Sequence, residues 1–226
     1  MLFKPPEDCT TTHSGCVNLS PGWFEQGHDV GNSLYISYDY SFHIFNGCQT
    51  EEDDLKPSAS LKLENSNTGG RAWLCDIAES SALISAVLRV VHPDQYLMGR
   101  SAIEKMGEQE PLIAVLAIWI SVFNAVQILS NRETPRHRDR SSPPWYDILT
   151  TVGPYQSAMF ELPGVGLRFP YNSGTIISLC GRILRHGVSE ADGDRVCLAY
   201  YMRENVQRRL GSTFAGWSKR YTEIVT

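Results

Sequence analysis

Two histidines and an aspartate carry the clearest chemical signal in the sequence. His137 and Asp139 stand two positions apart in the stretch NRETPRHRDRSSPPWYD, residues 131–147, and His186 lies well downstream in RILRHGVSE. Two imidazoles and one carboxylate form the facial triad that holds non-haem Fe(II) and leaves coordination positions open. Residues i and i+2 of an extended chain face the same side, so the first pair can reach one ion. The structural alternative is a salt-bridged loop, because four guanidinium groups surround the carboxylate, those of Arg132, Arg136, Arg138 and Arg140.

A fourth residue strengthens the metal hypothesis. Arg195 opens the apolar segment RVCLAYY, which we predict to be a strand. A guanidinium that points into a β-barrel without a partner is costly. Its presence is explained if a carboxylate lies opposite, because arginine binds a planar carboxylate through two parallel hydrogen bonds. A chelating acid on the iron, with its far carboxylate on Arg195, fits this description.

The elements that must position these residues are mostly strands. From about residue 112, short apolar or alternating runs are separated by Gly, Pro, Asn and Asp at the spacing of a β-sandwich or barrel. We place His137 just past one predicted strand and His186 near the end of another, so the third ligand comes from an opposing strand, as a jelly roll allows. The runs are SVFNAVQILSN, WYDILTTVG, QSAMFELPG, VGLRFP, GTIISLCG, ILRHGVS and RVCLAYYMRE.

Helices are predicted before these strands. The segment 76–92 has an apolar stripe at helical spacing, a capping box formed by Asp76 and Glu79, and Pro93 at its end. A shorter helix is predicted over 99–107. We therefore predict a mostly β fold with flanking helices (α+β), in which a double-stranded β-helix, or jelly roll, is supported by N-terminal helices.

The chain divides by composition into two parts. Residues 1–70 are predicted to form an irregular acidic arm with one or two strands near 33–45, and residues 71–226 a domain whose jelly-roll core spans about 112–205. Residues 1–60 carry two cationic and nine acidic side chains, whereas residues 131–226 carry 13 and nine. The basic C-terminal part is compatible with a polyanionic partner.

Other bulk features exclude some classes of protein. The first residues lack a basic stretch followed by an apolar run, so we expect no secretory signal. The apolar run PLIAVLAIWISVF is too short for a bilayer core, which needs about 20 residues, and we expect no membrane partner. The six cysteines have no regular spacing, which favours reduced thiols. The oligomeric state is left open.

Taken in order, these features resemble the 2-oxoglutarate- and Fe(II)-dependent dioxygenases. More narrowly, HRDRSSPPWYDILTTVG and RVCLAYYMREN resemble the TET/JBP nucleic-acid-base oxygenases, over roughly residues 112–205. The resemblance implies that Fe(II) is held by His137, Asp139 and His186. It also implies that Arg195 holds the distal carboxylate of 2-oxoglutarate. Cys197 stands where the family often has a serine that helps, and a thiol is a weaker hydrogen-bonding group, so the clamp needs another donor.

The same resemblance implies a substrate side. Tyr201 matches the aromatic residue that stacks on a flipped base, Arg203 stands where a histidine approaches the base, and Ser142 replaces an Asn or Asp at the base edge. We assign phosphate contacts to Arg132, Arg136 and Arg140. A core aromatic is the alternative role for Tyr201, and a solvated face is the alternative role for the arginines.

The function implied is oxidation of a modified base in DNA with O2 as cosubstrate. The leading substrate is 5-methylcytosine, taken to 5-hydroxymethylcytosine and further, which is a step in DNA demethylation, and the base must leave the stack to reach a buried iron. A nuclear location follows from such a substrate, with a cytoplasmic one otherwise. The alternatives are N6-methyladenine, thymine, RNA or a small molecule as substrate, and an inactive jelly-roll module that binds nucleic acid or protein.

Overall fold

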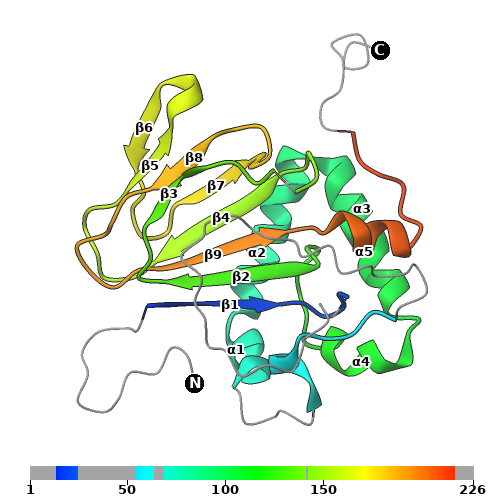
Figure 1. Cartoon of the computed structure of the whole chain (residues 1–226). Coiled ribbons are helices and arrows are strands. Elements are labelled where there is room, and N and C mark those ends of the chain that lie inside the picture. Colours follow the sequence, from blue (N-terminus) through cyan, green and yellow to red (C-terminus); the bar gives the residue numbers. More distant parts are fainter. Residues whose placement is uncertain (1–13, 25–53, 64–68, 141, 217–226) are drawn as a thin grey trace, which may run out of the picture.

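Two antiparallel sheets form the body of the protein. The computed structural model describes residues 14–24, 54–63, 69–140 and 142–216. The larger sheet has the order β1-β2-β9-β4-β7 and the smaller one β3-β8-β5-β6 (Figure 1). The strands are β1 Gly15–Leu19, β2 Ala125–Ser130, β3 Thr134–His137, β4 Asp147–Val152, β5 Met159–Leu162, β6 Leu167–Pro170, β7 Ile176–Leu179, β8 His186–Val188 and β9 Val196–Tyr201.

The chain crosses repeatedly between the two sheets. From β2 onward, β2, β4, β7 and β9 belong to the larger sheet, whereas β3, β5, β6 and β8 belong to the smaller one. One apolar cluster joins Phe160 and Val188 of the smaller sheet to Leu179 and Cys197 of the larger. The two sheets therefore share an interior, which is the arrangement of a double-stranded β-helix. The predicted fold class is confirmed.

Alternate side chains of β9 point to opposite faces of the larger sheet, so the strand contributes to two apolar clusters. Leu198 and Tyr200 are buried in the cluster that also contains helix residues, whereas Cys197 is buried between the sheets. Neighbouring residues of a strand point to opposite faces. Cys197 and Tyr201 consequently lie on the interior face, as does Arg195 one position before the strand.

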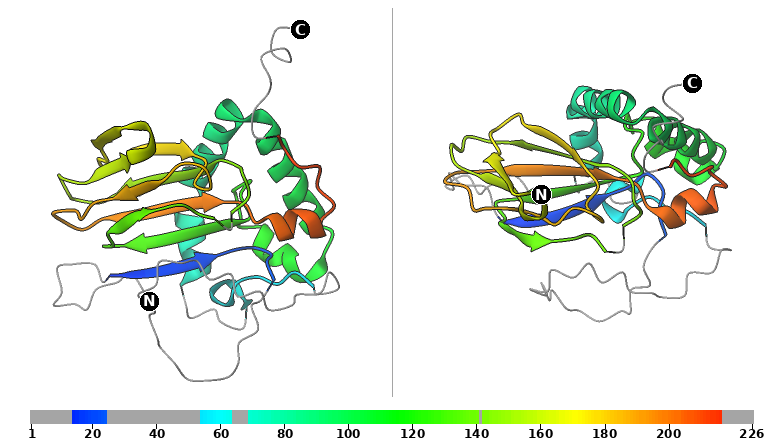
Figure 2. Two further views of the ribbon diagram at one scale, coloured as in Figure 1. Left: turned by 45° about the horizontal axis from the view of Figure 1, so that its top comes forward. Right: turned by 90° about the horizontal axis from the view of Figure 1, so that it is seen from above.

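Five α-helices accompany the sheets in the described residues. They are α1 Gly70–Asp76, α2 Ala78–Val91, α3 Pro93–Met106, α4 Glu110–Leu116 and α5 Glu204–Arg209, with short 3-10 turns at η1 Ala59–Leu61 and η3 Pro163–Val165. Ile84 and Leu88 of α2 pack in one cluster with Val126 and Ile128 of β2. Figure 2 shows the helices gathered on one side of the sheets. This layer supports the larger sheet from outside, as predicted.

The predicted helix boundaries were partly wrong. Asp76 ends α1, and Ile77 is the N-cap of α2 without a side-chain cap bond, so the predicted capping box does not form. The next helix, α3, begins at Pro93 rather than at 99. Proline fits the first helical position because it lacks only an N–H that would have no helical partner there. His92 caps α3 by accepting the Gln95 N–H at 3.2 Å through Nδ1.

The remaining sequence predictions concern the strands, the N-terminal arm and the domain boundary. Each of the seven predicted runs contains a strand, whereas β3 was not predicted. Strand β1 pairs with β2 from within the segment assigned to the arm, while the strands predicted at 33–45 fall outside the described residues. The domain boundary at residue 70 stays a prediction. Among the described residues, none of the helices has both the length and the apolar character needed to cross a membrane.

Candidate metal centre and cosubstrate pocket

The pairing of β3 with β8 brings the two predicted histidine ligands together. His137 ends β3 and His186 begins β8, where it is placed directly opposite His137 in the antiparallel register. Their ring centroids are 4.4 Å apart. The His186 ring is buried and stacks on Phe160, with 6.1 Å between centroids and 9° between planes. The prediction that His186 lies near the end of its strand was therefore wrong, because it is the first residue of β8.

Asp139 joins the two imidazoles from the chain just beyond β3. Its backbone N–H donates to the Gly181 carbonyl at 3.0 Å, which ties this segment to the chain after β7. One carboxylate oxygen lies 3.2 Å from Nε2 of His137 and the other 3.8 Å from Nε2 of His186. Among the described residues, the ion-pair contacts of the Asp139 carboxylate are with the two histidines rather than with the neighbouring arginines. The carboxylate faces the two histidines.

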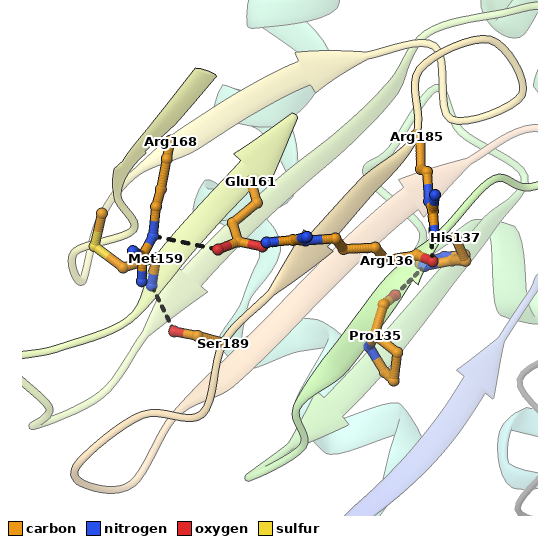
Figure 3. Close-up of polar contacts among 8 residues, drawn as sticks. All are labelled: Pro135, Arg136, His137, Met159, Glu161, Arg168, Arg185 and Ser189. Carbon is orange, nitrogen blue, oxygen red and sulfur yellow. Dashed lines mark hydrogen bonds and ion pairs between the residues drawn. The ribbon is translucent and has the colours of Figure 1, made fainter. Parts of the chain in front are cut away.

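Backbone carbonyls orient both rings as metal ligands. Nδ1 of His137 lies 2.8 Å from the Pro135 carbonyl, and Nδ1 of His186 lies 3.0 Å from the Leu184 carbonyl (Figure 3 shows the first). A neutral imidazole that donates Nδ1–H to a carbonyl presents the Nε2 lone pair. Both Nε2 atoms are turned toward Asp139, so the tautomer and the direction suit one shared ion.

The three side chains together meet the demands of a metal site. One ligand atom from each of His137, Asp139 and His186 lies within 4.8 Å of the others. Two nitrogen donors and one carboxylate oxygen are the donor set of the 2-His-1-carboxylate Fe(II) triad. This group has the geometry predicted from the sequence.

The ionisation of the three groups is adjusted by their contacts. The hydrogen bond with Asp139 raises the pKa of His137, whereas burial lowers the pKa of His186. Burial alone would raise the pKa of Asp139, but the hydrogen bond from His137 and the nearby imidazole charges lower it overall. The carboxylate is thus ionised at neutral pH, and His137 holds its proton more tightly than His186 does.

Gly181 and Asp147 complete the surroundings of Asp139. A Cβ atom at Gly181 would overlap the Asp139 carboxylate and lie 3.3 Å from an Asp147 carboxylate oxygen, so only glycine fits between them. Burial, followed by the negative charge of Asp139, raises the pKa of Asp147 well above its usual range. The raised pKa means that ionising Asp147 next to the Asp139 charge is unfavourable.

Arg195 lies buried between the sheets, as the sequence predicted. The residue is 3% exposed, and within the described residues its Nε and Nη1 have no hydrogen-bond partner. Its Nη2 donates to the Arg132 carbonyl. Asn131 holds its backbone, since the Asn131 side-chain oxygen accepts the Arg195 N–H at 2.7 Å and the Asn131 N–H donates to the Arg195 carbonyl at 2.8 Å. A fixed cation with open donors suits an incoming carboxylate.

Cys197 lies beside this guanidinium, two positions along the chain. Burial raises the pKa of the Cys197 thiol, and the charge of Arg195 opposes that shift. The hydroxyl oxygen of Tyr171 lies 3.7 Å from Sγ of Cys197. The thiol therefore lies close to Arg195 and Tyr171, but it is a weak hydrogen-bonding group, and its role toward the cosubstrate stays a prediction.

The predicted arginine contacts are only partly open. Nε of Arg136 forms an ion pair with Glu161 at 2.6 Å, and Arg168 contacts the same carboxylate at 3.2 Å. Figure 3 shows the Arg136 side chain extending to Glu161, on the side away from the His137 ring. Arg140 is exposed and Arg132 is half-buried. Of the three predicted phosphate contacts, Arg136 is thus already paired within the protein.

Tyr201 and Arg203 meet at the far end of β9. The Arg203 guanidinium lies 4.8 Å from the centroid of the Trp23 ring and 5.7 Å from that of Tyr201. Its backbone N–H donates to the Asn124 side chain at 2.9 Å. Arg203 is therefore held between two aromatic rings by cation–π contacts, and its role toward a base stays a prediction. The same holds for Ser142, whose N–H donates to the Asp139 carbonyl at 2.9 Å.

Sequence reasoning missed several residues of the site. Tyr171, Asn131 and Trp23 carried no motif, and each contacts a predicted residue only through long-range folding. Asn131 offered one signal, because asparagine tolerates positive φ and occurs in turns. Its φ is 47°.

The chain was compared with solved structures and with curated proteins. A solved structure, NgTET1 in complex with 5mC DNA, shares 16% sequence identity with the chain, at a TM-score of 0.49. The match covers 68% of this chain and 57% of the NgTET1 chain, so it spans little more than half the length of NgTET1 in that structure. No curated protein matches the chain.

The family assignment rests on a match to most of the sequence. Residues 43–204, more than half of the chain, match the model of the Tet_JBP family, the oxygenase domain of the 2OGFeDO superfamily. That superfamily uses Fe(II) and 2-oxoglutarate, and the described residues bring together a matching His-Asp-His group. The chain therefore belongs to the Tet_JBP family of 2-oxoglutarate- and Fe(II)-dependent oxygenase domains.

Proposed function

We propose that this protein is an Fe(II)- and 2-oxoglutarate-dependent dioxygenase that oxidises a modified base in DNA, with 5-methylcytosine as the leading substrate. The family supports the chemistry. The observation that carries the proposal is the buried guanidinium of Arg195, whose Nε and Nη1 have no partner among the described residues. A buried cation without an anion is costly. A bound dicarboxylate would relieve that cost.

The residues have distinct tasks in this reaction. His137, Asp139 and His186 would hold Fe(II), and Arg195 would bind the distal carboxylate of 2-oxoglutarate. When bound, Fe(II) with 2-oxoglutarate and O2 would supply the oxidising chemistry that hydroxylates a C–H bond, with succinate and CO2 as coproducts. The Pro135 and Leu184 carbonyls keep both imidazoles in the ligating tautomer. The aromatic interior around Phe160 excludes water.

Exposed arginines and the interior face of β9 support a DNA substrate. Arg138 and Arg140 are exposed beside the triad, where they would contact phosphates. Tyr201 lies on the same face of β9 as Cys197, so a base rotated out of the duplex would meet its ring. NgTET1 was solved with 5mC DNA, which agrees with this choice. We propose a nuclear location on the same ground.

A nucleoside assay tests the proposal directly. Fe(II)-loaded protein is incubated with 2-oxoglutarate, O2 and duplexes that carry 5-methylcytosine, N6-methyladenine or neither, and the digested nucleosides are measured by mass spectrometry. We expect hydroxymethyl, formyl or carboxyl derivatives of cytosine, and none with an Asp139→Asn variant. Unchanged nucleosides beside an active control enzyme would refute the proposal for DNA.

The pairing of Arg136 with Glu161 favours testing a second substrate class, because it removes one predicted phosphate contact. Binding to methylated DNA is therefore measured between low and high salt. Contacts to phosphates make affinity fall steeply with salt. Salt-independent binding, together with succinate formed only from a small molecule or RNA, would support that alternative.

A further inference from the structure

Tyr171 is fixed between the sheets with its hydroxyl directed at Cys197. The residue is fully buried, follows directly after β6, and packs its ring edge-on against Phe160, with 5.4 Å between centroids. Its N–H donates to the Ala158 carbonyl at 2.8 Å, and its carbonyl accepts the Tyr155 hydroxyl at 2.6 Å. The backbone of Tyr171 is therefore fixed by hydrogen bonds on both sides, and its ring is held by burial against Phe160.

The Tyr171 hydroxyl lacks a strong partner in this position. Within the described residues its hydrogen-bonding contact is Sγ of Cys197 at 3.7 Å, and a thiol is a weak donor and a weak acceptor. Leaving a buried hydroxyl without a good hydrogen bond costs free energy. A phenol that is held so firmly against a sulfur atom points to a missing acceptor.

Arg195 approaches the same place. Burial raises the pKa of Tyr171 well above its usual range, and the Arg195 charge acts against that shift. Arg195 also acts on the pKa of Cys197 and of Tyr155. The guanidinium, the thiol and the phenol thus share one small region. Its strong donors, the open N–H groups of Arg195 and the Tyr171 O–H, have no strong acceptor there among the described residues.

Tyr155 and Thr151 are the other hydroxyls of this region. The Tyr155 hydroxyl has one hydrogen, and its oxygen lies 2.6 Å from the Tyr171 carbonyl and 3.0 Å from Oγ1 of Thr151. That hydrogen is already used inside the protein. Thr151 lies opposite Cys197 on β4, and because the Tyr171 carbonyl can only accept, the Thr151 hydroxyl is left to donate to the Tyr155 oxygen. Of the two tyrosines, Tyr171 is the one whose hydroxyl faces the thiol rather than an oxygen, so its hydrogen is free to turn to a stronger acceptor.

We propose that Tyr171 is a cosubstrate-binding residue, whose hydroxyl donates to the distal carboxylate of 2-oxoglutarate beside Arg195. This rests on the proposed function and deepens it. In this proposal the carboxylate lies near Cys197, whose thiol forms only a weak hydrogen bond. The arrangement selects 2-oxo acids that carry a second carboxylate, because such a ligand satisfies both the cation and the phenol.

Calorimetric titration of 2-oxoglutarate into anaerobic Fe(II)-loaded protein tests the assignment without turnover. Tyr171→Phe removes only the hydroxyl, and we expect it to raise the Kd about tenfold or more, the range for a hydrogen bond to a charged group. Cys197→Ser in the Tyr171→Phe background should restore the Kd to within about threefold of wild type, because serine supplies the missing donor. Equal affinity of the wild type and Tyr171→Phe would overturn the proposal.

Two controls separate this role from a structural one. 2-Oxobutyrate lacks the distal carboxylate, so its Kd should be the same for wild type and Tyr171→Phe, whereas a parallel loss would show that the substitution merely disturbs the pocket. Thr151→Val and Cys197→Ala should each change the 2-oxoglutarate Kd less than Tyr171→Phe does, and the reverse order would move the donor elsewhere. If the wild type binds no 2-oxoglutarate, the proposed function itself fails. If the wild type and Tyr171→Phe bind it equally well, only the role of Tyr171 fails.

Discussion

His137 and His186 face each other as a directly opposed pair across the antiparallel β3–β8 ladder. The pairing makes the candidate metal centre a consequence of strand register. A slip of one residue turns every side chain of a strand to the other face, and it would separate the two imidazoles. The carbonyl of Pro135, within β3, and that of Leu184, just before β8, then orient the two rings, so the local chain at each strand adds to what the register sets.

Replacing Asp139 by asparagine should abolish tight metal binding. The variant keeps the size of the side chain but removes the charge that neutralises a divalent ion. Changes to partners outside the ligand shell weaken metal affinity by about 10- to 100-fold, and we expect the loss of a ligand charge to reach at least the upper value. Iron content after anaerobic loading, measured by atomic emission, checks this. An iron content equal to wild type would mean that Asp139 is no ligand.

The metal effect on thermal stability should increase as pH rises from about 6 to 8. The pKa of His137 is raised above its usual value of 6.5 and that of His186 is lowered, so His137 is the imidazole that must lose a proton to ligate. In the metal-free protein, the stabilisation from protonated His137 is fully present below pH 6.5. It is lost as the pH rises through the pKa of His137 in the folded state. His186 contributes in the opposite sense, since its stabilisation is lost as pH falls.

Metal binding requires the neutral form of His137, so the shift in Tm on adding Mn(II) should grow over the interval in which the metal-free protein loses the His137 contribution. Scanning calorimetry with and without the ion measures this difference. A Tm shift that is constant with pH would contradict the assignment of His137 as a ligand. The Asp139→Asn variant serves as the control, with little shift at any pH.

Gly181→Ala should damage the metal site. A Cβ atom there would overlap the Asp139 carboxylate, so the ligand must move. We expect metal affinity to fall at least about tenfold. Gly164→Ala is the matched control, because nothing lies within 4 Å of its added Cβ, and it should bind metal like the wild type. Equal metal affinity of the two variants would show that Asp139 can be displaced without consequence.

Arg195→Met should separate stability from cosubstrate binding. Replacing a buried charge by an apolar side chain of similar volume is often neutral or stabilising by about 1–4 kcal/mol, and Arg195 lacks an ion-pair partner for its Nε and Nη1 within the described residues. The metal-loaded variant should therefore unfold at the wild-type temperature or above, yet show a much smaller rise in Tm with 2-oxoglutarate than the wild type does. A strong loss of stability without ligand would instead make Arg195 a structural residue.

The sequence alone determined the residue types of the site and the kind of scaffold. His137, Asp139, His186 and Arg195 were recognisable because two imidazoles, a carboxylate and a buried guanidinium have few other uses together. The predicted strands followed from alternation, which is a local property of the chain. Their spacing predicted a sandwich or barrel, and the need for a third ligand from an opposing strand favoured a jelly roll.

Only the tertiary structure decided which groups are already paired and which remain open. Arg136 is bound to Glu161, Arg203 lies between Trp23 and Tyr201, and the hydroxyl of Tyr171 lies against Cys197 beside Arg195. The capping box at Asp76 failed because a preceding helix occupies that residue. The three side-chain pairings depend on strand register and on contacts between distant segments, whereas the capping box depends on where two neighbouring helices meet. A local sequence pattern holds no information about such contacts until the chain is folded.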